Sequence, residues 1–226
     1  MELSIIIVNY NTKKLTLECI ESVKKYTQKL KYELIVVDNG SSDGSATALQ
    51  KIGNIKFIQN DKNLGFAGAN NQGVKAAKGE FVLLLNSDTL LTANILAPLV
   101  AQMRKDRKLG IFSCALNSKD GSTQTTGGFF PSLPKVFAWM FFLDDIPFVG
   151  RIMRAYHPNL SFYNSPHRLD WVTGAFFLTR REVWDKIGYL DEGYFMYVEE
   201  LDFCFRAKRF GWEVFYDPKH SLIHYG

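Results

Sequence analysis

The sequence predicts an α/β fold in which a parallel, doubly wound β-sheet is flanked by helices. Two observations favour this class. Through the first half of the chain, short apolar runs alternate with segments whose apolar residues recur at helical spacing. The chain also has 226 residues, 46% of them hydrophobic, and can therefore bury a substantial core without disulfides. Alternation of strand and helix is typical of a parallel sheet.

The predicted elements follow one another in regular order. Each strand is a short run rich in β-branched or aromatic residues, and the first five are 3–8, 32–37, 55–58, 81–85 and 110–114. The helices between them carry apolar residues every three or four positions, at 14–26, 45–51, 66–77 and 94–105. Further along, we expect a strand over 171–178, helices from about 181 and over 197–210, and a strand near 214.

The periodicity fades between residues 117 and 170, where glycine and proline are frequent. A connection of this length without structure is uncommon inside a compact domain. We therefore expect it to hold short helices and a mobile segment that shapes a binding site.

Composition excludes several classes of protein. The net charge is +4 and the pI is about 8.8, but Lys and Arg are scattered, which argues against a dedicated nucleic-acid binder. The three cysteines lie far apart, so neither a disulfide framework nor a zinc knuckle is expected, and a reducing, cytoplasmic setting fits best. We expect no signal peptide, because Met1 leads into Glu2 and a short apolar segment without a basic n-region. We also expect no membrane-spanning helix, because no apolar run approaches about 20 residues.

Polar side chains gather where three predicted strands end. The first strand ends in "VNYN", the second in "VVDNGSSDGS" and the fourth in "NSD", which brings Tyr10, Asp38 and Asp88 to one rim of the sheet. Ligands of open parallel sheets bind at this rim. An acid that follows a buried strand is held rigidly and suits a Mg²⁺ or Mn²⁺ ion. Taken singly, Asp88 fits a helix N-cap and Asp38 an Asx turn, but three such residues on one rim favour a site.

The chain resembles family 2 glycosyltransferases with a GT-A fold, close to the bacterial rhamnosyltransferase-like branch. The matching stretches span nearly the whole chain in the order of the family: "SIIIVNYNT", "LIVVDNGSSDGS", "NLGFAGANNQGVKAAKGEFVLLLNSDT", "WVTGAFFLTRREVWDKIGYLDEGYFMYVEELDFCFRAKRFGW" and "LIHYG". The resemblance implies a Rossmann-like, mostly parallel sheet with a smaller acceptor-side lobe. It implies one domain, residues 1–226, with a nucleotide-sugar-binding half (1–116) and an acceptor-binding half (117–226), and a further C-terminal segment that is missing here.

The resemblance also implies roles for individual residues. Tyr10 packs near the nucleotide base and Asp38 accepts a base N–H; the nucleotide-sugar set is Val8, Asn9, Tyr10, Asp38, Asn70, Asn86 and Ser87. The metal ligands are Asp88 and His224, and the acceptor side includes Trp171, Gly174 and Asp202. Two positions depart from the family. Asn86 replaces the first acid of the D-x-D metal motif, and Asn70 stands where relatives often carry an arginine.

Sugar transfer also needs a base for the acceptor hydroxyl, and a carboxylate can serve. The stretch "YVEELDFCFR" offers Glu199, Glu200 and Asp202 at the start of a helix. The resemblance assigns the base to Glu200, with Glu199 left as the alternative. Asp202 and Arg206 are four apart, and we favour an ion pair between them. The structural alternative for all three acids is the preference of acids for the first turn of a helix.

The implied reaction is an inverting, metal-dependent transfer from a UDP- or dTDP-linked sugar to a glycan or lipid-linked acceptor, with Mn²⁺ or Mg²⁺, at the inner face of the cell membrane. Two rivals stay open: a sugar-phosphate nucleotidyltransferase and a non-catalytic nucleotide-sugar-binding protein. The aromatic segment 136–143 has two interpretations, contact with a membrane or burial against the acceptor lobe, and we favour burial. A dinucleotide oxidoreductase is excluded because "VNYNTKK" contains no glycine.

Overall fold

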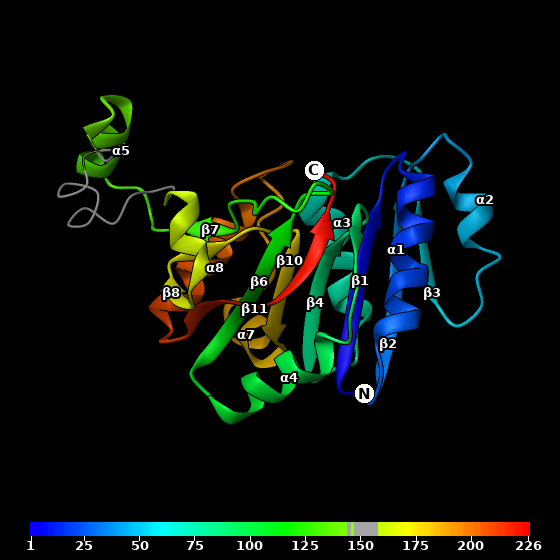
Figure 1. Cartoon of the computed structure of the whole chain (residues 1–226). Helices are drawn as coiled ribbons and strands as arrows, with labels where there is room; N and C mark the ends of the chain where they lie inside the picture. The colour runs from blue at the N-terminus through cyan, green and yellow to red at the C-terminus, as the bar shows by residue number, and fades with distance from the viewer. Residues whose placement is uncertain (144–145, 147–157) are drawn as a thin grey trace.

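The computed structural model describes residues 1–143, 146 and 158–226. A central sheet of nine strands runs in the order β3-β2-β1-β4-β10-β6-β11-β5, with β8 beside β11 (Figure 1). Its strands are β1 (Leu3–Asn9), β2 (Tyr32–Asn39), β3 (Lys56–Asn60), β4 (Phe81–Asn86), β5 (Thr89–Leu90), β6 (Leu109–Asn117), β8 (His167–Leu169), β10 (Phe176–Arg180) and β11 (Glu213–His224). A separate small sheet pairs β7 (Gly127–Gly128) with β9 (Trp171–Val172).

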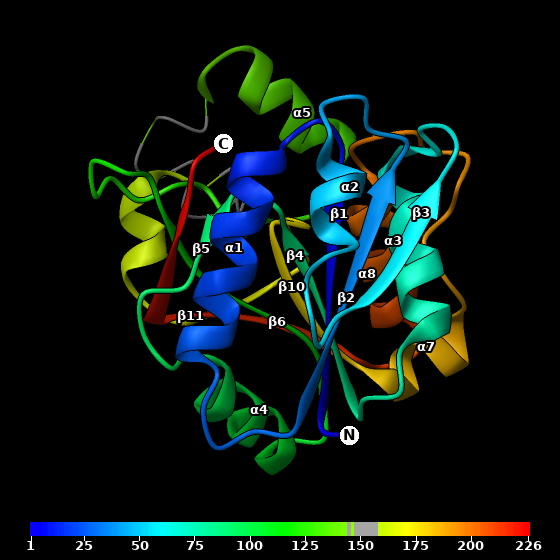
Figure 2. The same cartoon turned by 90° about the vertical axis from the view of Figure 1, so that its right-hand side faces the viewer.

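Helices cover both faces of the sheet. One layer holds α1 (Lys13–Tyr26), α2 (Ser45–Leu49) and α4 (Leu96–Lys105), and the other holds α3 (Gly65–Ala76), α7 (Arg181–Ile187) and α8 (Glu199–Arg209). Figure 2 shows α1 and α4 to one side of the sheet and α3, α7 and α8 to the other. The first five predicted strands and the four helices between them are confirmed, with ends shifted by a few residues.

The apolar run of β4 explains both layers. Side chains alternate between the faces of a strand, so Phe81, Leu83 and Leu85 pack in the core beneath α1 and α4. Val82 and Leu84 face the opposite core, beneath α3 and α8. A strand that is buried on both faces is apolar along nearly all of its length, and β4 becomes polar where it leaves the sheet. That exit is Asn86.

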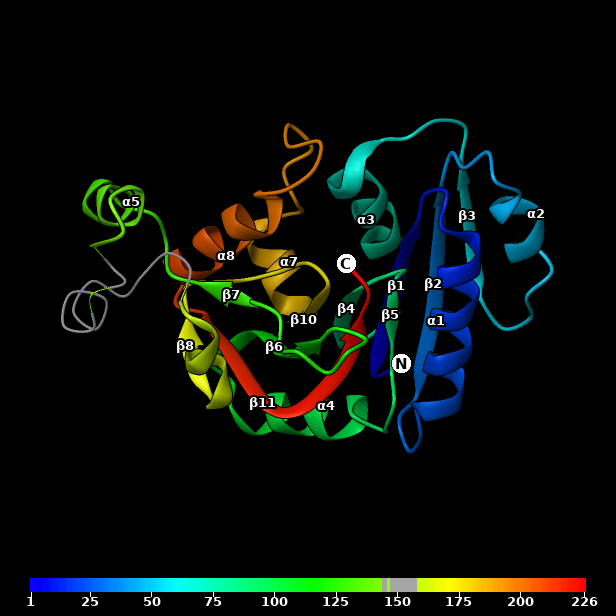
Figure 3. The ribbon, with the colours of Figure 1, turned by 45° about the horizontal axis from the view of Figure 1, so that its top comes forward.

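The sheet differs from the predicted one in the direction of β10. This strand pairs antiparallel with both β4 and β6, and the predicted strand 171–178 is divided between β9 and β10. The connection from β4 through α4 to β6 skips one place in the sheet, and β10 fills that place from the opposite direction. Strands β1, β2, β4, β6 and β11 still point the same way, so their carboxyl ends share one edge (Figure 3).

The long predicted connection does contain short elements: β7, α5 (Leu133–Met140), a 3₁₀-helix over Leu160–Asn164, and β8. The mobile segment that we expected there falls partly on residues 144–145 and 147–157, which lie outside the described residues. The expected burial of segment 136–143 is wrong for most of its aromatic side chains. Phe137, Phe141 and Phe142 are 57%, 58% and 74% exposed, because α5 stands away from the sheet.

Candidate active site

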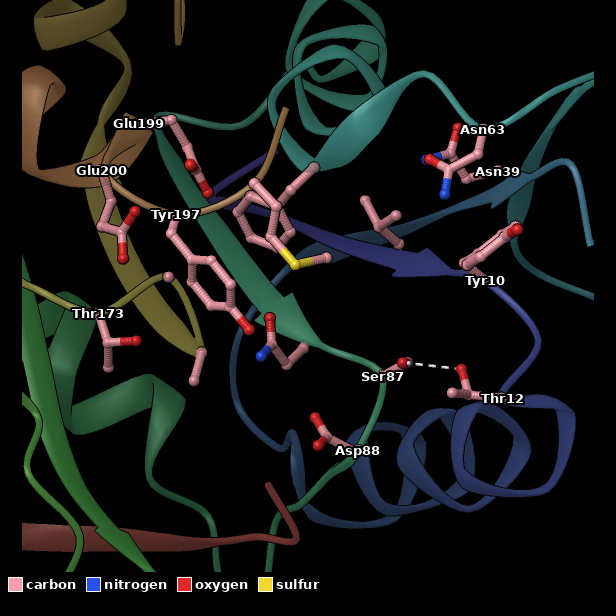
Figure 4. Close-up of a pocket in the computed structure, with 16 residues that line it drawn as sticks. Tyr10, Thr12, Asn39, Asn63, Ser87, Asp88, Thr173, Tyr197, Glu199 and Glu200 are labelled. Carbon is pink, nitrogen blue, oxygen red and sulfur yellow. Dashed lines mark hydrogen bonds between the residues drawn. The ribbon is translucent and has the colours of Figure 1, made fainter. Parts of the chain in front are cut away.

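A pocket of about 330 Å³ opens at the carboxyl edge of the sheet. Two regions far apart in sequence form it: the ends of β1, β2 and β4 with the start of α3, and the start of β10 with the segment entering α8. Its lining residues are Val8, Tyr10, Thr12, Asn39, Asn63, Phe66, Asn86, Ser87, Asp88, Thr173, Gly174, Ala175, Met196, Tyr197, Glu199 and Glu200. Figure 4 shows Glu199 and Glu200 on one side, Tyr10 and Asn39 on the other, and Asp88 below them.

Several residues predicted for the nucleotide sugar lie in this lining. Val8 and Tyr10 come from the end of β1, and Tyr10 is 47% exposed, so one face of its ring is open to a ligand. Asn86 and Ser87 follow β4. The hydroxyl of Ser87 lies 3.0 Å from that of Thr12, which ties the end of β4 to the start of α1.

Asn9 and Asp38 lie behind the lining. Asn9 Nδ2 donates to Asp38 Oδ1 at 2.6 Å and to the Ser41 hydroxyl at 2.9 Å. Its Oδ1 accepts hydrogen bonds from Thr12 and Thr16. Asp38 is fully buried and also accepts from the Ser41 backbone N–H. The amide of Asn9 therefore has all its donors and acceptors engaged inside the protein. These two residues join strands β1 and β2 instead of facing the pocket.

The side chain that does reach the pocket from β2 is Asn39, which the sequence interpretation did not single out. Its Nδ2 donates to Asn63 Oδ1 at 2.8 Å, and its Oδ1 accepts from the Leu64 backbone N–H at 3.0 Å. Asn39 thus anchors the loop before α3. Strand alternation could have revealed it, because neighbouring residues on a strand face opposite sides.

Asn70 is also turned away from the pocket. Its Nδ2 donates to the carbonyl of Phe66 one turn earlier in α3, and only 2% of the residue is exposed. The next residue, Asn71, binds the segment that follows α7, through the Leu190 backbone and the Glu192 carboxylate. Asn71 therefore holds the segment after α7 in place, whereas Asn70 bonds within its own helix.

Asp88 meets His224 because the end of β11 pairs with β5. The register places His224 opposite Thr89, next to Asp88 in sequence. His224 Nε2 lies 3.4 Å from Asp88 Oδ1, and the Gly226 backbone N–H donates to Oδ2 at 3.2 Å. Burial on its own raises the pKa of Asp88, but the neighbouring His224 ring and the backbone donors, including the Gly226 N–H, bring the pKa below its ordinary value. Asp88 is therefore held as a carboxylate.

The donor set fits a divalent cation. Two atoms 3.4 Å apart can both bind one ion, since ligand bonds of about 2.1 Å permit separations up to about 4.2 Å. The Asn86 side chain lies beside them, with Nδ2 3.5 Å from His224 Nε2. Among the described residues, no group of three or more His, Cys, Asp and Glu side chains is arranged for a metal. A two-residue set suits Mg²⁺ or Mn²⁺, which take their remaining ligands from phosphate and water.

Glu199 and Glu200 begin α8 at the opposite side of the pocket. Each carboxyl has one oxygen, Oε2, that is buried without a hydrogen-bond partner among the described residues. Burial first, and then the charge of Glu200, raise the pKa of Glu199 to about 7. Burial also raises the pKa of Glu200, while the N–H of Gly174 and the hydrogen bond with Glu199 act in the opposite direction. Within the pair, the interaction between the two carboxyls raises the pKa of Glu199 and lowers that of Glu200, which favours Glu199 as the protonated partner.

The remaining acceptor predictions divide. Gly174 lines the pocket, whereas Trp171 and Asp202 lie outside its lining. Asp202 forms the expected ion pair with Arg206, 2.8 Å from carboxylate to Nε, and this prediction is confirmed. Arg206 also donates to the carbonyls of Ile187 and Tyr189, so the pair fastens α8 to the segment after α7.

The segment before α8 was missed as a part of the site. Met196 and Tyr197 line the pocket, and in Figure 4 the Tyr197 ring extends into it from the side of the two glutamates. Tyr197 and Val198 both have positive φ, 68° and 75°, which is uncommon for residues other than glycine. Backbone angles of this kind leave no clear sequence signal. The apolar run in "GYFMYV" is the one available hint.

A family model described as "Glycosyl transferase family 2" matches residues 4–188. The chain therefore belongs to family 2 of the glycosyltransferases, as the sequence predicted. Among curated relatives, an N-acetylglucosaminyl-diphospho-decaprenol L-rhamnosyltransferase of Mycobacterium tuberculosis is 26% identical over 85% of this chain and 66% of its own length. A low-salt glycan biosynthesis hexosyltransferase of Haloferax volcanii is 28% identical over 92% of this chain and 62% of its own. The chain thus spans just under two thirds of these relatives.

Solved structures agree on the GT-A fold. GalNAc-T7, determined with UDP, GalNAc and Mn²⁺, superposes with a TM-score of 0.74 at 19% identity, covering 100% of this chain and 43% of that one. A mannosyltransferase of Pyrobaculum calidifontis, in complex with GDP-Man and Mn²⁺, gives 0.68 at 16% identity, covering 99% and 56%. The predicted fold class is confirmed. No helix among the described residues is long and apolar enough to cross a membrane.

Proposed function

We propose that this protein is an inverting, divalent-metal-dependent glycosyltransferase that moves a sugar from a UDP- or dTDP-linked donor to a glycan or lipid-linked acceptor. One observation carries the proposal: Asp88 and the Glu199–Glu200 pair line the same pocket from opposite sides. A diphosphate held at Asp88 then leaves an anomeric carbon between the metal ligands and a base. The sugar transfer for which the Mycobacterium and Haloferax relatives are named supports this proposal.

The donor half, residues 1–116, supplies the nucleotide wall and the metal ligands in this proposal. The Tyr10 ring offers a stacking face for the base, and Asn39 and Asn63 border the same wall. Asp88 and His224 would hold Mn²⁺ or Mg²⁺, with Asn86 beside them. When bound, the ion neutralises the charge that develops on the departing diphosphate.

The acceptor half, residues 117–226, supplies the base. The acceptor oxygen attacks the anomeric carbon as the bond from that carbon to the diphosphate oxygen breaks, and the hydroxyl proton passes to Glu200. Glu199 keeps its own proton and donates a hydrogen bond to Glu200, so one carboxylate of the pair is free to accept. A single displacement with one base inverts the anomeric centre. This arrangement supports Glu200 as the base and Glu199 as its hydrogen-bonding neighbour.

We place the reaction in the cytoplasm, at the inner face of the membrane when the acceptor is lipid-linked. All three cysteines, Cys19, Cys114 and Cys204, are free and buried, which supports a reducing compartment. The GT-A domain is a single unit in this proposal, since one sheet runs through both halves.

The test is a panel of UDP-, dTDP- and GDP-linked sugars incubated with Mn²⁺, scoring donor hydrolysis and transfer. The parent should turn over one nucleotide class, and Asp88→Ala should lower the rate at least about 100-fold by removing an electrostatic stabiliser. Asp61→Asn, an exposed acid away from the pocket, is the matched control and should behave as the parent. A parent that binds a donor but never hydrolyses or transfers it would support the non-catalytic alternative. A parent that condenses a sugar phosphate with a nucleoside triphosphate would support the nucleotidyltransferase.

A further inference from the structure

The side chain of Gln124 holds His224 in place through hydrogen bonds. Gln124 lies in the segment between β6 and β7, and its backbone N–H donates to the Leu116 carbonyl of β6 at 2.8 Å. The neighbouring bridge between Asn117 and Thr123 closes a turn at the end of the strand. The backbone of Gln124 is therefore fixed to the central sheet, and its side chain projects toward the end of β11.

The amide of Gln124 has one orientation that satisfies its neighbours. Its Nε2 donates to the His224 backbone carbonyl at 2.9 Å and to the Ser118 hydroxyl at 2.9 Å. A carbonyl can only accept, so the nitrogen end must face it. The oxygen end, Oε1, is then left 2.7 Å from His224 Nδ1. Exchanging the two ends would set oxygen against oxygen at the His224 carbonyl.

This orientation decides the tautomer of His224. Because Oε1 can only accept, Nδ1 must carry the hydrogen of the neutral imidazole. Nε2 then keeps its lone pair, and it is the atom that lies 3.4 Å from Asp88 Oδ1. A histidine ligand binds a metal through such a lone pair, and its tautomer is set by the partner of the other nitrogen.

We infer that Gln124 is a positioning residue of the metal site, which holds His224 in the Nδ1–H form with Nε2 directed at the cation beside Asp88. The same amide binds both the ring and the backbone carbonyl of His224, so it also fixes the last residue of β11 against Asp88. A neutral amide does this without adding charge to the site. The inference rests on the proposed function only for the cation; the tautomer is a property of the metal-free protein.

The first measurement uses the metal-free protein. Long-range ¹H–¹⁵N correlation at a pH where imidazole is neutral reports which ring nitrogen of His224 bears the proton, with His224→Gln identifying the signals. We expect the Nδ1–H form in the parent and a loss of that preference in Gln124→Met, which is similar in size but has no amide. Gln124→Glu keeps an acceptor for Nδ1–H and should retain the tautomer. An Nε2–H tautomer in the parent overturns the inference.

The second measurement is a Mn²⁺ titration with UDP present, read from the electron paramagnetic resonance signal of free Mn²⁺. Gln124→Met should weaken Mn²⁺ binding by about 10- to 100-fold. Gln28→Met, at an exposed position, is the matched control and should bind like the parent, and thermal melting checks that each variant is folded. Parent-like affinity in Gln124→Met overturns the inference. If the parent itself binds no Mn²⁺, the metal part of the proposed function fails, and the tautomer measurement still decides the role of Gln124.

Discussion

The two sides of the pocket differ in how completely their polar groups are paired. On the side of β1 and β2, Asn9 makes four side-chain hydrogen bonds and Asp38 has a partner on each oxygen. On the side of α8, Glu199 and Glu200 each keep one buried oxygen without a partner among the described residues. An unpaired buried oxygen costs free energy, so a fold that retains two of them leaves acceptors for a group that arrives later.

The backbone shows the same contrast. Strand β1 pairs with β2 and β4 in unbroken register along its length. The segment before α8 instead exposes successive apolar side chains, Tyr194 to Val198, and contains two consecutive residues with positive φ. Strained backbone of this kind persists where surrounding contacts hold it, and it is common at binding sites. The side of β1 and β2 therefore has its polar groups paired within the fold, whereas the side of α8 retains unpaired and strained groups.

The largest expected effect is on the acceptor side. Glu200→Gln removes the proposed base, and kcat should fall about 10²- to 10⁴-fold with little change in donor binding. Glu199→Gln should stay within about tenfold of the parent, because an amide N–H can replace the carboxyl proton that Glu199 donates. Steady-state kinetics and donor titration of the two variants make the comparison. Equal losses in both variants would contradict the assignment of the base to Glu200.

A loss of stability is expected when the paired side is broken. Asn9→Ala leaves the buried Asp38 without its 2.6 Å donor and removes the Oδ1 that accepts from Thr12 and Thr16. The free energy of unfolding should drop by about 2–3 kcal/mol, the cost of unsatisfied buried groups. Urea denaturation measures it, with the exposed Asn164→Ala as a control expected within about 0.5 kcal/mol of the parent. A drop in the free energy of unfolding as small as that of the control would show that the hydrogen bonds of Asn9 do not stabilise the junction of β1 and β2.

The limits of sequence reasoning follow from what is local and what is not. Strand β4 and its polar exit at Asn86 are recognisable because an uninterrupted apolar run marks a strand buried on both faces. The antiparallel direction of β10 is not recognisable from the sequence, because a strand carries no local signal of its direction. The pairing of β11 with β5, which places His224 beside Asp88, likewise joins residues more than a hundred positions apart.

The candidate site residues near the strand ends differ in whether they line the pocket. Tyr10, Ser87 and Asp88 line the pocket, whereas Asn9 and Asp38, one position away in the alternation of a strand, face inward. Counting that alternation would have separated the two groups. Strand alternation does not predict the position of Gln124, because that position depends on the turn that returns the chain to the end of β6.

A smaller effect should follow from a substitution at the contact between the start of α3 and the segment before α8. Gly65 has φ +78°, and a Cβ there would lie 2.5 Å from the Phe195 carbonyl oxygen, which accepts a hydrogen bond from the Phe66 N–H. Gly65→Ala should therefore destabilise the fold by about 1–2 kcal/mol and raise KM by displacing Met196 and Tyr197. Gly53→Ala, where a Cβ meets nothing within 4 Å, is the matched control. Thermal denaturation and steady-state kinetics measure the two effects. Equal results for both variants would show that the contact of α3 with Phe195 does not position Met196 and Tyr197.

The smallest effect concerns pH and the Glu199–Glu200 pair. Burial and the charge of Glu200 raise the pKa of Glu199 to about 7 in the folded protein, above its ordinary value of 4.5. Between these two values the folded chain binds more protons than the unfolded chain, so the contribution of Glu199 to stability is complete at low pH and is lost as pH rises through 7. Glu199→Gln removes this titration. The free energy of unfolding of the variant, relative to that of the parent, should rise by about 1–2 kcal/mol from pH 5 to pH 8. This is less than the full pKa shift of Glu199 implies, because solvent in the pocket screens part of the effect. Urea denaturation at both pH values measures the difference. A gap between variant and parent that does not change with pH would mean that Glu199 holds no proton in the folded state, and the pairing that frees Glu200 to act as the base would be lost with it.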